Sequence, residues 1–550
     1  MTDTPSGANA TRIPNPAAEA AAARPSAVRS RSEGLPTRTR RALQRAGELI
    51  EKGRADEADQ ALAGVATDHP EVQRVLGIVR HLQQRHADAI GLLRRAATQL
   101  PHDALILNNL GTALRGAGDL QAAESTFLRA CEVDPKLAAA WFNLGITYTA
   151  QLDVGRAAEA FGRALACDPR HLRARISYAD ALLQLGRLDE VAAHYRAGIA
   201  QDPGNVHNWV GLANINTLRF TADDVVALEQ LVDASSDPEQ RVGARFVLAR
   251  ALEDQNRYGE AFTALSLANA AKRRQLEWDA GAFSRHVDAI MAAFAKPPTP
   301  ARDPSLGREV IFIVSLPRSG STLVEQIVSS HSDVEGANEL SALGDVFQGE
   351  SRRRGVDFTQ WAAQATPQDW QRLGKEYLAQ TARWRKNHRV FTDKALGNWR
   401  YVGAALAMLP GARFINCRRD PVETSLSCYR QTFGKGHAYS YDIAEMAAYW
   451  HDYDRLTRFW AARYPHRMLD VMHEQLLDDP ETEIRRILDF CELPFEPACM
   501  RFHDSQRTVR TLSAAQVRQP LRRSTARASG YAELLSPLRW ALGVEQAFAD

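Results

Sequence analysis

The chain has 550 residues, of which 45% are hydrophobic and 24% are charged, and its formal net charge is +2. This length is enough for two sizeable hydrophobic cores, and the nearly neutral charge argues against a generic nucleic-acid binder. No stretch approaches the roughly 18 uncharged apolar residues of a membrane span, so we expect none. The 6 cysteines and 15 histidines have no metal-ligand spacing, which predicts reduced thiols, a cytoplasmic location and no bound metal.

Residues 1–38 are rich in alanine, proline, serine, arginine and threonine, and their apolar residues show no period. Such a segment buries too little apolar surface to fold, so we expect disorder over this range. Acidic and polar residues interrupt it throughout, and it contains no continuous apolar core of a signal peptide.

Proline recurs at positions 101, 135, 169 and 203, which are 34 residues apart. In one such period the pattern consists of Trp141, Leu144, Gly145, Tyr148, Ala157, Phe161, Ala164 and Pro169. The neighbouring periods repeat much of it. This is the signature of the tetratricopeptide repeat, in which two antiparallel helices cross at small residues and a proline follows the second helix. We therefore predict an α-solenoid of tetratricopeptide and similar helical repeats over residues 39–295.

Stacked repeats of this kind form a concave groove that commonly holds an extended peptide or a segment of a partner protein. The repeat signature does not specify what the groove binds. Two interpretations stay open: the groove binds a protein acceptor or partner, or the solenoid only caps the rest of the chain or dimerises it into a homodimer. A Pro-Pro-Thr-Pro sequence at 297–300 marks a linker, 296–307, before a second domain at 308–550.

The second domain begins with a strand pattern at 310–314, a short loop, and an amphipathic helix that starts near Thr322. The loop offers a guanidinium, hydroxyl donors and a glycine that lets the backbone approach an anion: Arg318, Ser319, Gly320, Ser321 and Thr322. Backbone N–H groups and the positive helix end converge there, which predicts a phosphate or sulfate site. No Gly-Lys-Ser/Thr ending is present, so the loop is not a Walker A sequence. The alternative is an ordinary strand-to-helix turn with a surface arginine.

Residues 317–322 (Pro-Arg-Ser-Gly-Ser-Thr) resemble the loop that binds the 5′-phosphosulfate of 3′-phosphoadenylyl sulfate (PAPS) in sulfotransferases. The similarity is closest to tyrosylprotein sulfotransferases and to the bacterial proteins that join such a domain to tetratricopeptide repeats, and it covers roughly residues 308–542. It implies a P-loop-like α/β domain with a mainly parallel central sheet and both phosphate sites at the carboxyl ends of strands. It also implies transfer of a sulfuryl group from PAPS to an acceptor hydroxyl, without a metal.

A second strand–turn–helix pattern occupies residues 412–427. Its apolar part predicts a buried strand, and an Asp-Pro pair after the turn is typical of a helix start. Arg419 and Ser427 lie eight residues apart, and in sulfotransferases an arginine and a serine at this spacing hold the 3′-phosphate, which implies that role here. Gln431 stands where the family has a basic residue, with Arg430 one step earlier. The alternative is a solvated arginine pair and a serine on a helix surface.

Two further segments match the catalytic groups of the family. In tyrosylprotein sulfotransferases a glutamate just beyond the helix after the phosphosulfate loop is the general base, which implies this role for Glu339. The corresponding loop here, residues 317–322, is called the donor loop below. The reaction needs such a group, because the acceptor hydroxyl loses its proton as the S–O bond forms. The family also places a lysine after a short strand, where it stabilises charge on the departing 3′-phosphoadenosine 5′-phosphate (PAP), and Lys394 fits that place. A solvated glutamate and a surface lysine are the alternatives.

The C-terminal segment 511–527 resembles the flexible part of the family that folds over the nucleotide. The spacing of that family implies that Ser513, Gln516 and Arg527 lie near the donor phosphates, although Arg527 falls about one residue short of the usual basic position. His473 stands where the family usually has a tyrosine. These departures leave the exact donor contacts open.

Three classes of function remain after these assignments. As a sulfotransferase, the protein is expected to act on a tyrosine of a protein or peptide, because the base is a glutamate and the repeats offer a peptide-sized groove. A glycan, a lipid or a small phenol is the alternative acceptor. A nucleotide-dependent phosphoryl transferase with the same loop is disfavoured, since neither a Walker lysine nor an obvious Mg²⁺-binding carboxylate is present. A repeat scaffold with an inactive transferase domain is the non-enzymatic alternative.

Overall fold

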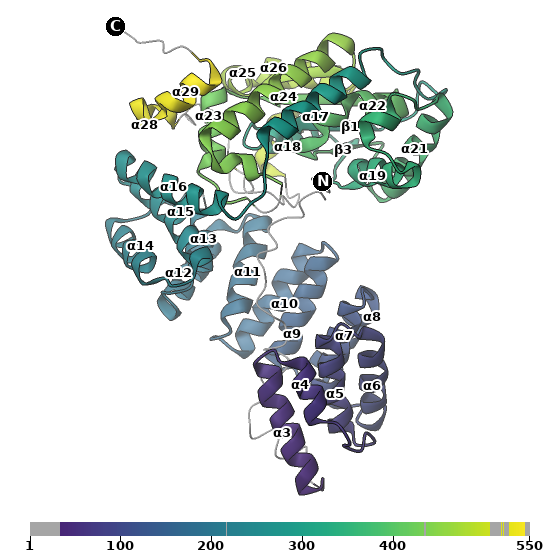
Figure 1. Ribbon diagram of the computed structural model, residues 1–550, viewed down its shortest axis with the longest axis vertical. Coiled ribbons are helices and arrows are strands. Elements are labelled where there is room, and N and C mark those ends of the chain that lie inside the picture. Colours follow the sequence, from purple (N-terminus) through teal and green to yellow (C-terminus); the bar gives the residue numbers. More distant parts are fainter. Residues whose placement is uncertain are drawn as a thin grey trace. The chain divides into compact units, whose positions relative to one another are not determined.

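The computed structural model describes residues 34–215, 217–433, 436–505, 517, 519, 521 and 527–544 (Figure 1). The segment expected to be disordered, 1–38, lies mostly outside these residues. The described chain divides after Leu212 into two compact units. No helix in the described ranges is long and apolar enough to cross a membrane.

The first unit is a series of helices joined in pairs by short turns. They are α3 (Thr37–Glu51), α4 (Ala55–Ala61), α5 (Pro70–Leu82), α6 (His86–Gln99), α7 (Ala104–Gly116), α8 (Leu120–Val133), α9 (Ala138–Ala150), α10 (Val154–Cys167), α11 (Leu172–Leu185), α12 (Leu188–Gln201) and α13 (Val206–Ala213). Each proline of the 34-residue period follows the second helix of a pair, as Pro135 follows α8 and Pro169 follows α10. The predicted α-solenoid of tetratricopeptide repeats is therefore confirmed in this unit.

Small residues let the two helices of a repeat cross closely. A Cβ atom at Gly111 would lie 2.7 Å from the ring of Phe127, and one at Gly145 would lie 2.5 Å from the ring of Phe161. Both phenylalanine side chains are buried in the core of the repeats. The glycines and aromatic residues of the repeat pattern are thus packing residues, because no larger side chain fits at the crossing points.

The second unit opens with the four helices that follow the repeats: α14 (Ala222–Ala234), α15 (Pro238–Asp254), α16 (Tyr258–Arg273) and α17 (Ala280–Ala293). Helix α17 packs along the long helix α24 (Ile443–Arg463). The Ser284 hydroxyl donates to Asp452 at 2.7 Å, and the ring centroids of Phe294 and Trp460 lie 5.3 Å apart. These helices therefore share one compact unit with the rest of the C-terminal half.

A parallel sheet of five strands forms the centre of the second unit (Figure 1). Its strands are β1 (Val310–Ser315), β2 (Val334–Gly336), β3 (Val390–Asp393), β4 (Arg413–Arg418) and β5 (Met468–Met472), in the spatial order β2-β3-β1-β4-β5. All four pairings are parallel, with Ile313 opposite Ile415 near the centre. The predicted mainly parallel α/β sheet is confirmed, and the carboxyl ends of its strands lie at one edge.

Helices cover both faces of the sheet. Successive side chains of a strand point to opposite faces, and accordingly Phe312 and Val314 pack in one hydrophobic core while Ile311 and Ile313 pack in another. The remaining helices are α18 (Ser321–Val328), α19 (Ala342–Arg354), α20 (Phe358–Ala362), α21 (Pro367–Gln380), α22 (Val402–Met408), α23 (Pro421–Tyr429), α25 (His473–Asp478), α26 (Pro480–Phe490), α27 (Pro497–Met500), α28 (Ala528–Tyr531) and α29 (Ser536–Leu542). Short 3₁₀ helices are η1 (Ala382–Arg385), η2 (Leu396–Tyr401), η3 (Ala438–Tyr441), η4 (Phe502–Asp504) and η5 (Ala532–Leu535).

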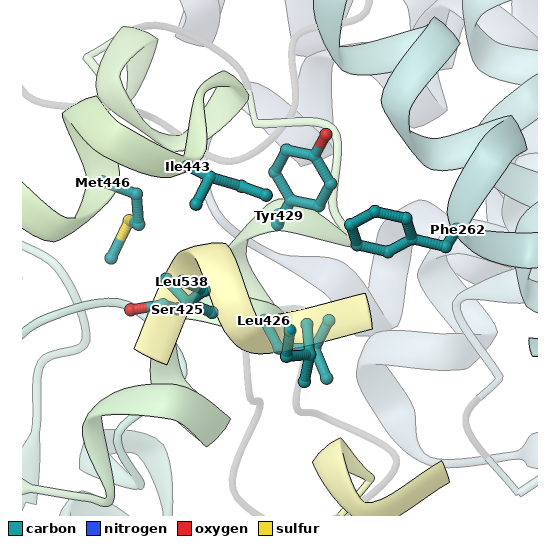
Figure 2. Close-up of a pocket in the computed structure, with 8 residues that line it drawn as sticks. Phe262, Ser425, Leu426, Tyr429, Ile443, Met446 and Leu538 are labelled. Carbon is teal, nitrogen blue, oxygen red and sulfur yellow. The ribbon is translucent and has the colours of Figure 1, made fainter. Parts of the chain in front are cut away.

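Helix α23 is held by apolar contacts with several other helices. A small apolar pocket lies against it, between α16, α24 and α29 (Figure 2). The pocket is lined by Phe262, Ser425, Leu426, Tyr429, Ile443, Met446, Leu535 and Leu538. Asn269 of α16 also donates from Nδ2 to the carbonyl oxygen of Tyr429 at 2.9 Å. Elements far apart in the sequence thus fix the position of α23.

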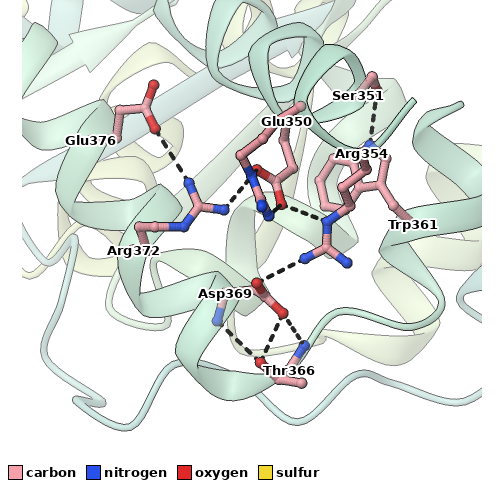
Figure 3. A network of polar contacts seen from close by, with 9 residues as sticks. Glu350, Ser351, Arg354, Trp361, Thr366, Asp369, Arg372 and Glu376 are labelled. Atoms are coloured by element: carbon pink, nitrogen blue, oxygen red, sulfur yellow. Dashed lines mark hydrogen bonds and ion pairs between the residues drawn. The ribbon is translucent and has the colours of Figure 1, made fainter. Parts of the chain in front are cut away.

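A buried carboxylate joins the helices that connect β2 to β3 (Figure 3). The Glu350 side chain is 1% exposed and accepts hydrogen bonds of 2.6 Å from Arg353, Arg354 and Arg372. The hydrogen bond from Arg353, followed by those from the other two arginines, lowers the pKa of Glu350 to about 2. Arg354 also pairs with Asp369 at 2.8 Å. This network fixes α19 against α21.

Candidate functional site

The loop between β1 and α18 turns sharply at two residues. Arg318 and Gly320 both have left-handed backbone conformations, with φ of 67° and 90°. Gly320 is the N-cap of α18, and the N–H groups of the first helical turn point toward the loop. Three hydroxyl-bearing residues are buried around it: Ser319, Ser321 and Thr322. The strand, loop and helix expected from the sequence are therefore present.

Gly320 packs directly against His473, the first residue of α25. A Cβ atom at position 320 would lie 2.7 Å from Nδ1 of this imidazole. Burial and the nearby Arg419 guanidinium lower the pKa of His473 to about 4, so the ring is neutral at physiological pH. His473, which replaces the tyrosine of the resembling family, thus lies beside the predicted donor loop.

Helix α23 and the turn before it bring the second predicted phosphate-binding pair against the same loop. Arg318 donates from Nε to the Ser427 hydroxyl at 3.2 Å. Arg419 donates from Nη1 to the carbonyl oxygen of Arg318 at 3.3 Å. Arg318 and Ser427 are 109 residues apart in the sequence, and the segments that carry them therefore form one site.

Guanidinium groups are concentrated around this contact. Burial, together with Arg419 and Arg430, lowers the pKa of Arg318 to about 10. Burial, together with Arg430 and Arg250, lowers the pKa of Arg527 to about 10 as well. The surroundings of both side chains disfavour their charged forms, and a bound anion would offset that effect. Arg430 stands one residue before the position where the family has a basic residue, and it thus contributes to the positive potential.

One carboxylate connects this cluster to the C-terminal segment. Glu423 pairs with Arg419 at 3.2 Å, and its other oxygen accepts the backbone N–H groups of Arg527 and the next residue at 2.9 and 2.8 Å. Arg430 forms an ion pair with Glu253 of α15, which also lies 3.6 Å from Arg527. Arg527 is therefore held beside the predicted 3′-phosphate residue. Two other predicted contacts lie outside the described residues: Ser513 and Gln516.

Glu339 and Lys394 are also brought together. Nζ of Lys394 lies 3.0 Å from Oε1 of Glu339, and the backbone N–H of Lys394 donates to the carbonyl oxygen of Asn338 at 3.0 Å. The lysine side chain is 1% exposed, whereas that of the glutamate is 33% exposed. The carboxylate therefore contacts a buried cation and remains open to solvent. The catalytic roles of the two residues stay predictions.

The sequence does not single out two buried carboxylates near this pair. Glu325 of α18 accepts hydrogen bonds from the Asn338 N–H and the Thr392 hydroxyl, both at 2.9 Å. Asp393 accepts the Tyr377 hydroxyl at 2.8 Å, and burial raises the pKa of this carboxyl to about 7. In the sequence, Glu325 stands out only as a charged residue inside an apolar run, Leu-Val-Glu-Gln-Ile-Val. Asp393 stands out only as a charged residue at the end of an apolar strand.

The raised pKa of Asp393 predicts a pH-dependent stability. Because the folded state favours the protonated carboxyl, Asp393 contributes to the free energy of unfolding. This contribution is fully present below the ordinary pKa of 3.8 and is lost as the pH rises through about 7. A tenfold change in acidity corresponds to about 1.4 kcal/mol, so this loss is on the order of 4 kcal/mol. Asp393→Asn stays neutral and should lack this part of the pH dependence, measured as the unfolding free energy in urea from about pH 4 to about pH 8.

The matched control for this measurement is Asp357→Asn, because Asp357 is exposed on the same unit. This variant should keep the loss of stability that Asp393 causes as the pH rises through about 7. An identical pH dependence in wild type and Asp393→Asn would contradict the expected titration of Asp393.

Comparisons with known proteins match both units of the chain. Residues 310–497 match the model of the Sulfotransferase family, and residues 43–104, 108–151 and 145–206 match the model of the Tetratricopeptide repeat. A solved thermophilic tetratricopeptide-repeat protein of Thermus thermophilus is 24% identical and covers 33% of this chain and 100% of its own, with a TM-score of 0.29.

Two curated proteins are similar over longer stretches. An uncharacterized protein of Aquifex aeolicus is 28% identical over 371 residues, which is 65% of this chain and 48% of that protein, so the chain spans about half its length. A protein of Caenorhabditis briggsae named "Putative protein-tyrosine sulfotransferase" is 22% identical over 202 residues, which is 36% of this chain and 70% of that protein. With the parallel sheet and the helical repeats, the matches to the two family models show that the chain joins tetratricopeptide repeats to a domain of the sulfotransferase family.

Proposed function

We propose that the protein transfers a sulfuryl group from PAPS to the hydroxyl of a tyrosine in a protein or peptide. The observation that carries this proposal is the contact between the loop after β1 and the α23 region, where Arg318 meets Ser427 and Arg419. The match of residues 310–497 to the sulfotransferase family supports the reaction type. The name of the C. briggsae relative supports tyrosine as the acceptor.

Arg318, Arg419, Arg430 and Arg527 form an arginine cluster, which suits a donor with several anionic groups. Arg318 and the hydroxyls of the loop would hold the phosphosulfate, while Arg419 and Ser427 would hold the 3′-phosphate. Binding would offset the burial and the repulsion between guanidinium groups that together lower the pKa of Arg318 and Arg527. This positive field needs no metal. The proposed donor-binding residues are Arg318, Ser319, Gly320, Ser321, Thr322, Arg419, Ser427, His473, Ser513, Gln516 and Arg527.

Glu339 and Lys394 supply the chemistry in this proposal. Glu339 takes the proton of the acceptor hydroxyl while the new S–O bond forms. The bond from sulfur to the bridging oxygen of PAPS breaks, and its electron pair leaves with PAP. Lys394 stabilises the charge that develops on that oxygen, assisted by Arg318. Because Lys394 is buried, water screens its field only weakly.

We also propose that the two parts of the chain have different functions. Residues 308–550 form the catalytic domain, and the repeats within 39–295 bind the acceptor protein or a partner through their groove, with 296–307 as the linker. The repeat matches support peptide binding only as a general property of such solenoids. A homodimer remains an alternative use of the repeats.

Gly320→Ala tests the donor loop. The left-handed backbone at this position strains any residue with a Cβ atom, and that atom would lie 2.7 Å from the ring of His473. We expect the loop to shift and the affinity for PAP to fall by at least about tenfold in calorimetric titration. Gly349→Ala in α19 is the control, because nothing lies within 4 Å of a Cβ atom there. Equal PAP affinity in both variants would contradict the assignment of the loop.

The proposed reaction is tested by incubating the protein with PAPS, without Mg²⁺, and with acceptors of different classes: a tyrosine peptide, a small phenol and an oligosaccharide. We expect mass spectrometry to detect sulfate on the peptide. Transfer only to the phenol or the sugar would keep the sulfotransferase reaction and overturn the tyrosine acceptor. Transfer of a phosphoryl group from ATP with Mg²⁺, or no transfer from PAPS to any acceptor, would overturn the proposed function.

A further inference from the structure

Glu325 lies one turn into α18, the helix that follows the donor loop. Its side chain is fully buried, with 0% exposure, although its helix neighbours Val324 and Ile327 belong to a hydrophobic core. Burying a carboxylate is unfavourable unless hydrogen bonds compensate for the lost water. An apolar residue would fill this position at a lower cost, so packing alone does not account for the acid.

The hydrogen bonds of this carboxylate reach the two segments that carry the proposed catalytic groups. Its Oε1 atom accepts the backbone N–H of Asn338 and the hydroxyl of Thr392, both at 2.9 Å. Asn338 immediately precedes Glu339, and Thr392 lies two residues before Lys394. One oxygen of α18 therefore touches both segments.

The two segments also bond to each other around this point. The Ala337 N–H donates to the Thr392 hydroxyl oxygen at 3.3 Å, and the Lys394 N–H donates to the carbonyl oxygen of Asn338 at 3.0 Å. In addition, Nζ of Lys394 lies 3.0 Å from Oε1 of Glu339. The donor-loop helix, the proposed base and the proposed lysine thus form one hydrogen-bonded unit.

We propose that Glu325 is a positioning residue that sets the distance between the donor loop and the Glu339–Lys394 pair. The inference rests on the proposed function, and Glu325 itself does not contact the reacting atoms. In-line transfer depends on close alignment, and a displacement of about 1 Å can lower the rate about 100-fold. A rigid link from α18 to both segments is one way to hold that alignment.

Two substitutions separate the reach of the side chain from its charge. Glu325→Gln keeps the length and an oxygen acceptor, whereas Glu325→Asp keeps the charge but is one methylene shorter. We expect kcat to stay within about tenfold of wild type in Glu325→Gln and to fall about 100-fold in Glu325→Asp. The Kd for PAP should stay within about threefold in both, because the donor contacts are on other residues. Glu376→Asp is the matched control, because the Glu376 side chain on α21 is 45% exposed.

A second measurement does not depend on turnover. Hydrogen exchange followed by mass spectrometry should show faster exchange of segments 334–341 and 390–395 in Glu325→Asp, with segment 310–315 unchanged. Thr392→Val removes the same hydrogen bond from the other side. Its effect on these segments should not add to that of Glu325→Asp, since both variants break one unit.

The outcomes distinguish this inference from the proposed function. Unchanged exchange in Glu325→Asp would overturn the inference even if the wild type transfers sulfate. A loss of kcat accompanied by an equal loss of PAP affinity, or by faster exchange throughout the unit, would make Glu325 a residue of general stability and would also overturn it. If the wild type transferred sulfate to no acceptor, the proposed function would fail, and the exchange experiment would still decide whether Glu325 links the three segments.

Discussion

Replacing Glu339 by glutamine should abolish sulfuryl transfer and leave PAP binding intact. The amide has nearly the same size but cannot accept the proton of the acceptor hydroxyl, and loss of a general base costs about 10³-fold in rate. Glu339 contacts Lys394 rather than the arginine cluster, so the affinity for PAP should change by less than about threefold. Steady-state kinetics with the acceptor peptide and calorimetric titration with PAP measure the two quantities.

Glu335→Gln is the matched control for this variant. Its side chain is 31% exposed, close to the 33% of Glu339, and it lies four residues earlier in the same segment. We expect this variant to retain the turnover of the wild type. Wild-type turnover in Glu339→Gln would place the general base elsewhere.

Lys394→Met should reduce kcat by about 10² to 10³-fold. Methionine fills the buried space of the lysine stem but carries no charge to stabilise the departing PAP. The side chain is 1% exposed, so water cannot replace the lost ammonium group easily. Single-turnover kinetics with saturating PAPS isolate the chemical step from product release.

The exposed Lys386 provides the comparison for Lys394, since Lys386→Met removes a charge from the surface of the same unit. This control should keep its kcat. If Lys394→Met retained more than about a third of the wild-type rate, the lysine would have no role in stabilising the leaving group.

Much of the fold could be predicted because its signals are local. The run at 310–314 predicts a buried strand and becomes β1 (Val310–Ser315), and the helix expected near Thr322 begins at Ser321. The prolines spaced by 34 residues lie where second helices end, because proline cannot continue a helix. Period, turn residues and helix-capping residues are properties of short segments, so a single sequence displays them.

The grouping of helices could not be predicted in the same way. A helical pair shows which of its faces is apolar, but not which element covers that face. The pair α15 and α16 looks like a further repeat, yet it shares a compact unit with the sheet. Phe262 of α16 packs near Tyr429 of α23 with ring centroids 6.3 Å apart, a contact that bridges 167 positions of sequence.

The same limit applies to the candidate site. The sequence predicted Arg318, Glu339, Lys394 and Arg419 as site residues one by one, but nothing in it showed that Glu325 bonds to the segments carrying two of them. The role proposed for Glu325 depends on three segments that meet only after folding. A buried charge in an apolar helix run is a weak signal by itself, and it gains meaning from its partners.

The central claim is that the arginine cluster binds the 3′-phosphate and the 5′-phosphate group of a PAPS-type nucleotide. Calorimetric titration of the whole protein with PAP, ADP and ATP, without Mg²⁺, tests it most directly, with Arg419→Ala measured alongside. We expect PAP to bind at least about tenfold more tightly than ADP, and this preference to disappear in the variant. Equal affinities for PAP and ADP in the wild type would contradict the sulfuryl-donor site.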